Sequence, residues 1–131
     1  MEAILDQLRE YWRIEDPRQT RGLTESQLTL LLSLSEHAGC RVQDMAEQLD
    51  LTAPTISIGV RRLENIGLVE RKSDTKDQRA VCLYLSPLGK KIATRAKKFH
   101  TAKLEGLLGA LSDKEQETVL SLLERALSKK D

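Results

Sequence analysis

Apolar residues recur every three to four positions through most of the chain, which is the spacing of one face of an α-helix. The first stripe predicts a helix from Glu2 to about Trp12. A loop is expected next, because Pro17 and Gly22 interrupt the pattern. Leucines between Leu28 and Leu34 surround the second helix, so we expect that helix to be buried.

Polar residues mark several helix starts. Thr24 and Gln27 have the spacing of a capping box, in which each side chain bonds the backbone of the other residue. Ser86 is placed to cap a long helix that runs from Pro87 to about Ala110, since proline is favoured in a first helical turn. A second capping box at Ser112 opens the last helix.

Two short helices and a hairpin are predicted in the middle of the chain. An apolar stripe over 42–49 gives one helix, and Thr52 caps the next, which begins near Ala53 and ends at Gly67. About three residues separate the two helices, so they form a helix-turn-helix candidate. Strands are expected over 68–72 and 79–85. The fold class is therefore mainly α with a small β-hairpin.

Charge is unevenly distributed, although the 131 residues carry a net charge of only +1. Residues 1–51 hold five Lys/Arg against ten Asp/Glu, whereas residues 52–100 hold eleven against four. A local basic patch of this kind is expected of a phosphate-binding face. A charged surface that is merely solvated is the alternative.

Other classes of protein find less support. The apolar run from Leu28 to Leu34 is too short to span a bilayer, and the two cysteines form no CxxC pair, so a reducing cytoplasm is the expected location. The sequence has no P-loop, GxSxG or HExxH motif, and His37 and His100 lack an obvious catalytic partner. We therefore predict no enzyme, cofactor or metal site.

The predicted helix over 53–66 has one face suited to DNA. At 100° per residue, Ile56, Val60 and Leu63 share the face that docks on the core. Arginine, serine and threonine side chains on the other faces can bond bases or phosphates. Ile58 stands among them and can contact a thymine methyl, or it is simply an exposed apolar side chain. The candidates on and just before this helix are Thr52, Pro54, Thr55, Ser57, Ile58, Arg61 and Arg62.

The hairpin adds a second group of candidates. Asp77 and Arg79 lie two residues apart and so project from the same side of an extended strand, where the carboxylate can orient the guanidinium. An arginine held in this way can enter a narrow minor groove, although an exposed salt bridge of little energetic value is the alternative. Arg71, Lys72 and Lys76 add positive charge.

These motifs resemble the MarR (multiple antibiotic resistance regulator) family of winged helix-turn-helix transcription factors. The resemblance is strongest over Thr52 to Gly89, and it lies in TxxTxS followed by RRLE, in GLVERK, in the DxR of the hairpin and in LxLSPxG. Two positions depart from it, because many relatives carry a basic residue at Ile58 and an acidic one at Arg61.

The resemblance implies a single domain over 1–131. Dimerisation helices would occupy 1–22 and 87–131, and the winged lobe 24–86 would hold the recognition helix (about 53–66) and the wing (about 68–86). It implies a homodimeric repressor on double-stranded DNA, with half-sites of a pseudopalindromic operator on the order of 34 Å apart. It also implies a small aromatic or phenolic effector.

Two further hypotheses remain open at this point. The Ile58 face can instead bind another protein, which would make the chain a winged-helix interaction module. Cys40 precedes a helix start and adjoins Arg41, two features that can lower a thiol pKa, so a redox-sensing regulator is the other possibility. An ordinary loop thiol is the plainer interpretation of Cys40.

Overall fold

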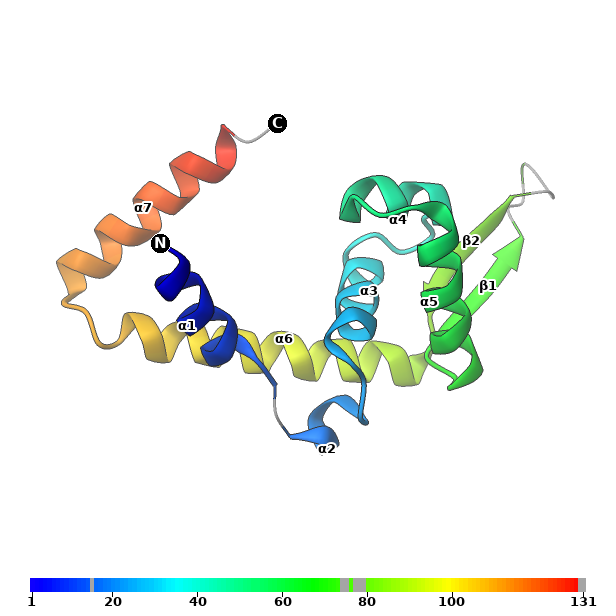
Figure 1. Cartoon of the computed structure of the whole chain (residues 1–131), viewed down its shortest axis with the longest axis horizontal. Helices are drawn as coiled ribbons and strands as arrows, with labels where there is room; N and C mark the ends of the chain where they lie inside the picture. Colours follow the sequence, from blue (N-terminus) through cyan, green and yellow to red (C-terminus); the bar gives the residue numbers. More distant parts are fainter. Residues whose placement is uncertain (15, 74–75, 77–79, 130–131) are drawn as a thin grey trace. The chain divides into compact units, whose positions relative to one another are not determined.

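The computed structural model describes residues 1–14, 16–73, 76 and 80–129. It is mainly helical, with one antiparallel hairpin (Figure 1). The elements in chain order are α1 (Glu2–Trp12), α2 (Pro17–Thr20), α3 (Glu25–Glu36), α4 (Val42–Leu49), α5 (Ala53–Asn65), β1 (Val69–Ser73), β2 (Val81–Leu85), α6 (Pro87–Leu108) and α7 (Asp113–Ser128). The chain divides into two compact units, Ile14–Lys97 and Met1–Arg13 with Lys98–Asp131.

The predicted capping signals are confirmed. Thr24 Oγ1 accepts from the Gln27 backbone N–H at 3.1 Å, and the Gln27 side-chain oxygen accepts from the Thr24 N–H at 2.9 Å. Thr52 Oγ1 likewise caps α5 by accepting from the Thr55 N–H, at 3.4 Å. Gly67 has a φ of 78°, a left-handed conformation that glycine adopts without strain, and it ends α5 as expected.

One predicted loop is partly wrong. Residues 17–20 form the single-turn helix α2 in the segment where Pro17 and Gly22 were expected to prevent regular structure. Asp16 explains the turn, because its carboxylate accepts from the backbone N–H of Arg18 at 2.9 Å, as an N-terminal cap does. A proline in the first turn also costs the helix no hydrogen bond.

The larger unit has a continuous apolar core. The leucines of α3 are largely buried, as predicted, and α5 contributes Ile56, Val60 and Leu63, each no more than 1% exposed. Helix α4 and the hairpin complete the core from two further sides. The other main core residues are Leu28, Leu30, Leu31, Leu34, Met45, Ala46, Leu68, Val69, Leu83, Leu85, Ile92, Ala93 and Ala96.

The base of the hairpin is fixed to the end of α5 and to the start of α6. Ser86 Oγ donates to the carbonyl of Gly67 at 2.6 Å and accepts from the backbone N–H of Gly89 at 3.0 Å. A side chain at Gly89 would collide with the Leu68 carbonyl oxygen, so this helix turn can approach the hairpin only as glycine. The hairpin therefore has a defined position beside α5 (Figure 1).

The smaller unit is built around α1, the end of α6 and α7. The Trp12 and His100 rings stack with centroids 4.6 Å apart, and the Tyr11 hydroxyl donates to the Lys103 carbonyl at 2.9 Å. Burial lowers the pKa of His100. Within the described residues, α1 and α7 have no buried side chain. Large apolar residues of this unit are exposed instead, namely Ile4, Leu5, Leu8, Trp12, Leu104, Leu107, Leu120, Leu122, Leu123 and Leu127.

Candidate nucleic-acid interface

Helix α5 divides into a buried face and an exposed face, as the periodicity predicted. Ile56, Val60 and Leu63 fix it to the core, so the rotation of the helix about its axis is determined by packing. The exposed face carries Pro54, Thr55, Ile58, Arg61 and Arg62, with Ser57 half-buried beside them and Thr52 exposed at the cap.

The start of α5 presents polar groups in a fixed arrangement. The hydroxyls of Thr52 and Thr55 are 2.8 Å apart, within hydrogen-bonding distance of each other. Pro54 has no backbone N–H and the Thr55 N–H donates to Thr52 Oγ1, so this helix start attracts an anion such as phosphate mainly through the partial positive charge of the helix dipole. The end of α5 nearest Thr52 is therefore suited to a phosphate, while the side chains farther along can contact bases.

The structure changes the interpretation of Arg71. Its Nε donates to Glu64 Oε1 at 3.2 Å, with both side chains about one-third exposed. The pair joins the last turn of α5 to strand β1. Arg71 therefore contributes to the position of the hairpin, and the partner carboxylate offsets part of the charge that a phosphate would encounter.

The other hairpin candidates fall in two groups. Lys72 extends over the Tyr84 ring, with its Nζ 5.1 Å from the ring centroid, and Lys76 is exposed. Both residues place positive charge on the hairpin. Arg79, which is predicted to enter a minor groove, and Asp77, which is predicted to orient it, lie outside the described residues.

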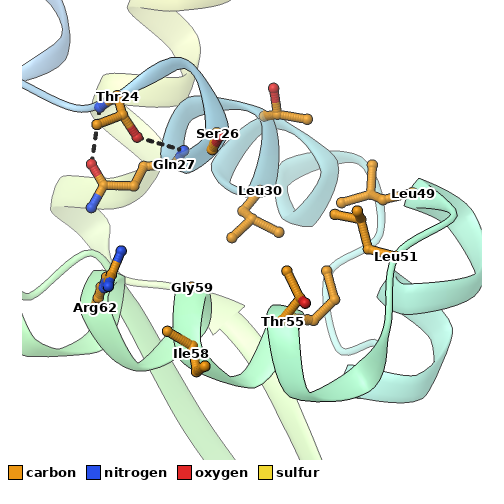
Figure 2. Close-up of a pocket in the computed structure, with 12 residues that line it drawn as sticks. Thr24, Ser26, Gln27, Leu30, Leu49, Leu51, Thr55, Ile58, Gly59 and Arg62 are labelled. Carbon is orange, nitrogen blue, oxygen red and sulfur yellow. Dashed lines mark hydrogen bonds between the residues drawn. The ribbon is translucent and has the colours of Figure 1, made fainter.

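A cavity of about 420 Å³ lies between α3 and α5, beside the exposed face of α5 (Figure 2). Thr55, Ile58 and Arg62 belong both to its lining and to the predicted DNA-binding residues. The remaining lining residues are Thr24, Ser26, Gln27, Thr29, Leu30, Leu49, Leu51, Ile56 and Gly59. Sequence analysis did not predict this cavity. Its one local signal is Gly59, since glycine inside a helix is unfavourable unless packing requires it.

The environment of Cys40 disagrees with the redox hypothesis. Burial raises the pKa of the Cys40 thiol, and the carboxylate of Asp44 raises it further. A higher pKa leaves less thiolate, which is the form that reacts with oxidants. The sequence predicted a lowered thiol pKa, because Cys40 precedes a helix and adjoins Arg41. That prediction is wrong.

We expect Cys40 to be a slow nucleophile at neutral pH. In a Cys82→Ser variant, alkylation of Cys40 by iodoacetamide at pH 7 should be slower than that of a cysteine in an unstructured peptide. Its rate should still rise with pH after the peptide rate has levelled off, because the thiol pKa is raised. Mass spectrometry over a pH series measures both rates, and a faster Cys40 reaction at pH 7 would restore the redox hypothesis.

The helix-turn-helix of α4 and α5, followed by a hairpin packed next to its second helix, defines a winged helix-turn-helix protein. The family model described as the MarR family matches residues 23–81, which include α4, α5 and β1 and end at the first residue of β2. The chain belongs to the MarR family and is a DNA-binding transcription regulator of that family.

Individual relatives agree with this assignment. The HTH-type transcriptional repressor MdtR of Bacillus subtilis is 32% identical over 71 residues, which are 54% of this chain and 46% of MdtR. The HTH-type transcriptional regulator YxaD of the same organism is 30% identical over 111 residues, 85% of this chain and 78% of YxaD. A crystal structure of Streptococcus pneumoniae FabT in complex with DNA has a TM-score of 0.83 at 20% identity, covering 97% of this chain and 92% of FabT. The FabT likeness establishes the fold.

Among the described residues, no helix is both long enough and apolar enough to cross a membrane.

Proposed function

We propose that this regulator is a homodimeric repressor that binds a pseudopalindromic operator and loses affinity for it when a small effector binds. The observation that carries the proposal is the exposed face of α5, where Ile58, Arg61 and Arg62 stand beside a basic hairpin. The repressor assignment has further support from MdtR, whose name describes it as a repressor. The effector assignment has support from the cavity between α3 and α5.

Helix α5 is assigned to the major groove. Arg61 and Arg62 can each bond guanine or phosphate, and Thr55 and Ser57 can bond either. The side chain of Ile58 is 53% exposed, and a groove would cover it and bring it near a thymine methyl. Thr52 and Pro54, at the start of the helix, are assigned to contacts with the sugar-phosphate backbone of the DNA beside the groove.

The hairpin is assigned to the neighbouring minor groove. Arg79 would enter the groove with Asp77 orienting it, an assignment that rests on the DxR pattern and the family resemblance. Lys72 and Lys76 would approach phosphates, and Arg71 would do so from its ion pair with Glu64. Arginine is suited to this role because narrow minor grooves concentrate negative potential.

The dimer is assigned to α1, the end of α6 and α7, the elements with exposed leucines. Many exposed large apolar side chains on so few helices favour a protein interface, because apolar patches on monomers are usually small. A second copy of the chain would cover it, and the two lobes could then meet two half-sites of one operator. The single-domain division predicted from sequence, with dimerisation helices over 1–22 and 87–131 and a lobe over 24–86, is retained as part of this proposal.

We expect Leu123→Glu to separate the protomers. Leu123 is 51% exposed in the single chain, and burying a carboxylate at that position in an interface costs several kcal/mol. Sedimentation at micromolar concentration should show a monomer, and operator affinity should fall at least tenfold because one lobe then binds alone.

Ser121→Glu is the matched control. It adds the same charge to α7, but at 100° per residue it lies about 160° around the helix from Leu123. The control should remain dimeric and keep its operator affinity. A Leu123→Glu protein that stays dimeric would rule out α7 as the interface.

A further inference from the structure

Most of the basic excess of the central segment lies on α6, beyond α5 and the hairpin. Residues 52–86 hold six Lys/Arg against four Asp/Glu, whereas residues 87–100 hold five Lys/Arg and no Asp/Glu. The proposed contacts of α5 and the hairpin therefore account for only part of the positive charge that the sequence concentrates here. The first half of α6 carries a second basic surface.

The cations of α6 point away from the core of the larger unit. The buried residues of α6 are Gly89, Ile92, Ala93 and Ala96. Lys90, Lys91 and Arg95 lie on the other side of the helix and are exposed, and we call these three side chains the α6 cationic face. Among the described residues, none of the three has a carboxylate partner, in contrast to Lys97, which pairs with Glu36 at 2.7 Å.

Helix α3 separates this face from α5. Leu30 of α3 packs closely against Gly59 of α5, whereas Glu36 of α3 reaches Lys97 of α6. At 100° per residue, Glu36 lies about 120° around α3 from Leu30, and Ser35, which shares a hollow with α6, lies about 140° from Leu30 in the other sense. Helices α5 and α6 therefore pack on opposite sides of α3, and a duplex seated on α5 leaves the α6 cationic face uncovered.

The composition of the α6 cationic face favours a nucleic-acid backbone over a protein. Lysine and arginine neutralise phosphates without any requirement for a base sequence. Protein interfaces, by contrast, are depleted in lysine and depend on apolar anchors. Over 87–97, a range that the structure describes in full, no large apolar side chain is exposed. A membrane surface is disfavoured for the same reason, because a helix that lies on it buries an apolar face.

We propose that the α6 cationic face binds the phosphate backbone of a second DNA duplex, so that a regulator seated on one duplex through α5 bridges to another. Lys91 and Arg95 are about 6 Å apart along the helix axis, and Lys90 adds a third charge beside them. B-DNA carries one charge per about 1.7 Å, so several phosphates lie within reach of this face. Bridging rests on the proposed function for the first duplex, whereas DNA binding at α6 is independent of it.

A capture assay measures the second duplex directly. A duplex selected for tight binding is fixed to beads and loaded with the protein, and a labelled duplex of unrelated sequence is added at low salt. Lys91→Ala/Arg95→Ala should retain at least about tenfold less labelled duplex than the wild type, because two phosphate contacts are lost. Its affinity for the fixed duplex should stay the same. Both positions are exposed and alanine favours a helix, so the variant should fold.

Lys114→Ala/Arg125→Ala is the matched control. It also removes one lysine and one arginine from exposed positions of a helix, here α7, so the two double variants have the same net charge. The control should capture the labelled duplex like the wild type. Bridging through the two α5 helices of a dimer would survive in both variants, so equal capture by the two would overturn the proposal.

Three further measurements test the chemistry of the contact. Lys91→Arg/Arg95→Lys should capture like the wild type, because backbone contacts need charge but no fixed geometry, and a loss of capture would reject such contacts. Three phosphates predict a fall in capture of about 40-fold between 50 and 200 mM salt. Polyglutamate that competes as well as duplex DNA at equal charge would count against a nucleic acid. Tighter binding to phosphatidylserine vesicles than to duplex, lost in Lys91→Ala/Arg95→Ala, would assign the face to a membrane instead.

Failure of this inference and failure of the proposed function give different results. A wild type that binds the fixed duplex but captures no labelled duplex would refute the inference while the proposed function stands. A wild type whose binding to every duplex depends on Lys91 and Arg95, and is unchanged in Arg62→Ala, would refute the proposed role of α5 and leave the α6 surface established.

Discussion

Leu63→Ala should lower the free energy of unfolding by about 2–5 kcal/mol, the range observed when a buried leucine is truncated in a packed core. Leu63 is 1% exposed and lies on the face of α5 that fixes the helix to the lobe. The loss combines the transfer free energy of the missing methylenes with the cost of the remaining cavity. Urea unfolding at a fixed protein concentration measures it.

Ile58→Ala provides the matched control on the same helix. Ile58 has a similar size but is 53% exposed, so its truncation should change the free energy of unfolding by no more than about 0.5 kcal/mol. The two variants should also differ in DNA binding below their unfolding transitions. Ile58→Ala should weaken binding to selected fragments, whereas folded Leu63→Ala should bind nearly as well as the wild type. The reverse pattern would mean that α5 presents a different face to DNA.

DNA affinity should fall steeply as salt is added. If the two lobes of a dimer together contact six to ten phosphates, the association constant should drop roughly 10³- to 10⁵-fold between 50 and 200 mM salt, because each contact releases condensed counterions. The basic segment over 52–100, with eleven Lys/Arg against four Asp/Glu, is the source of this effect. Fluorescence anisotropy with a labelled duplex at several salt concentrations gives the slope.

A cation that lies outside the proposed DNA-binding elements supplies a control for the salt experiment. Arg125→Ala removes an exposed cation from α7, outside the proposed DNA-binding elements, and should leave the slope unchanged. Lys72→Ala removes one phosphate contact from each of the two lobes and should reduce the slope of the dimer by about two. A slope near zero for the wild type would mean that phosphates contribute little to the complex.

Local signals were sufficient to predict most of the secondary structure. The capping box of Thr24 and the left-handed Gly67 depend on residues close in sequence, and both are confirmed. The helix α2 was missed because its cap, Asp16, precedes a segment in which proline and glycine suggested only a loop. A single helical turn can therefore be stabilised by a capping carboxylate even where no apolar stripe predicts a helix.

The candidate site was predictable to a smaller extent. The exposed face of α5 follows from helical periodicity alone, because the core side is marked by its apolar residues. The Arg71–Glu64 pair and the cavity could not be predicted in this way. Each is formed by residues of different elements, which come together only when the lobe folds. The close packing of Leu30 of α3 against Gly59 of α5 cannot be predicted from a local sequence pattern. Asp77 and Arg79 remain predictions from the sequence.

The central claim is that α5 and the hairpin read the sequence of a DNA duplex. The most direct test selects genomic fragments that the wild-type protein retains, then compares its affinity for the best fragment with that for a scrambled duplex at constant salt. We predict at least about 10³-fold tighter binding to the selected fragment, and a marked loss of that preference in Arg79→Ala. Equal affinity for the selected and scrambled duplexes would contradict the claim.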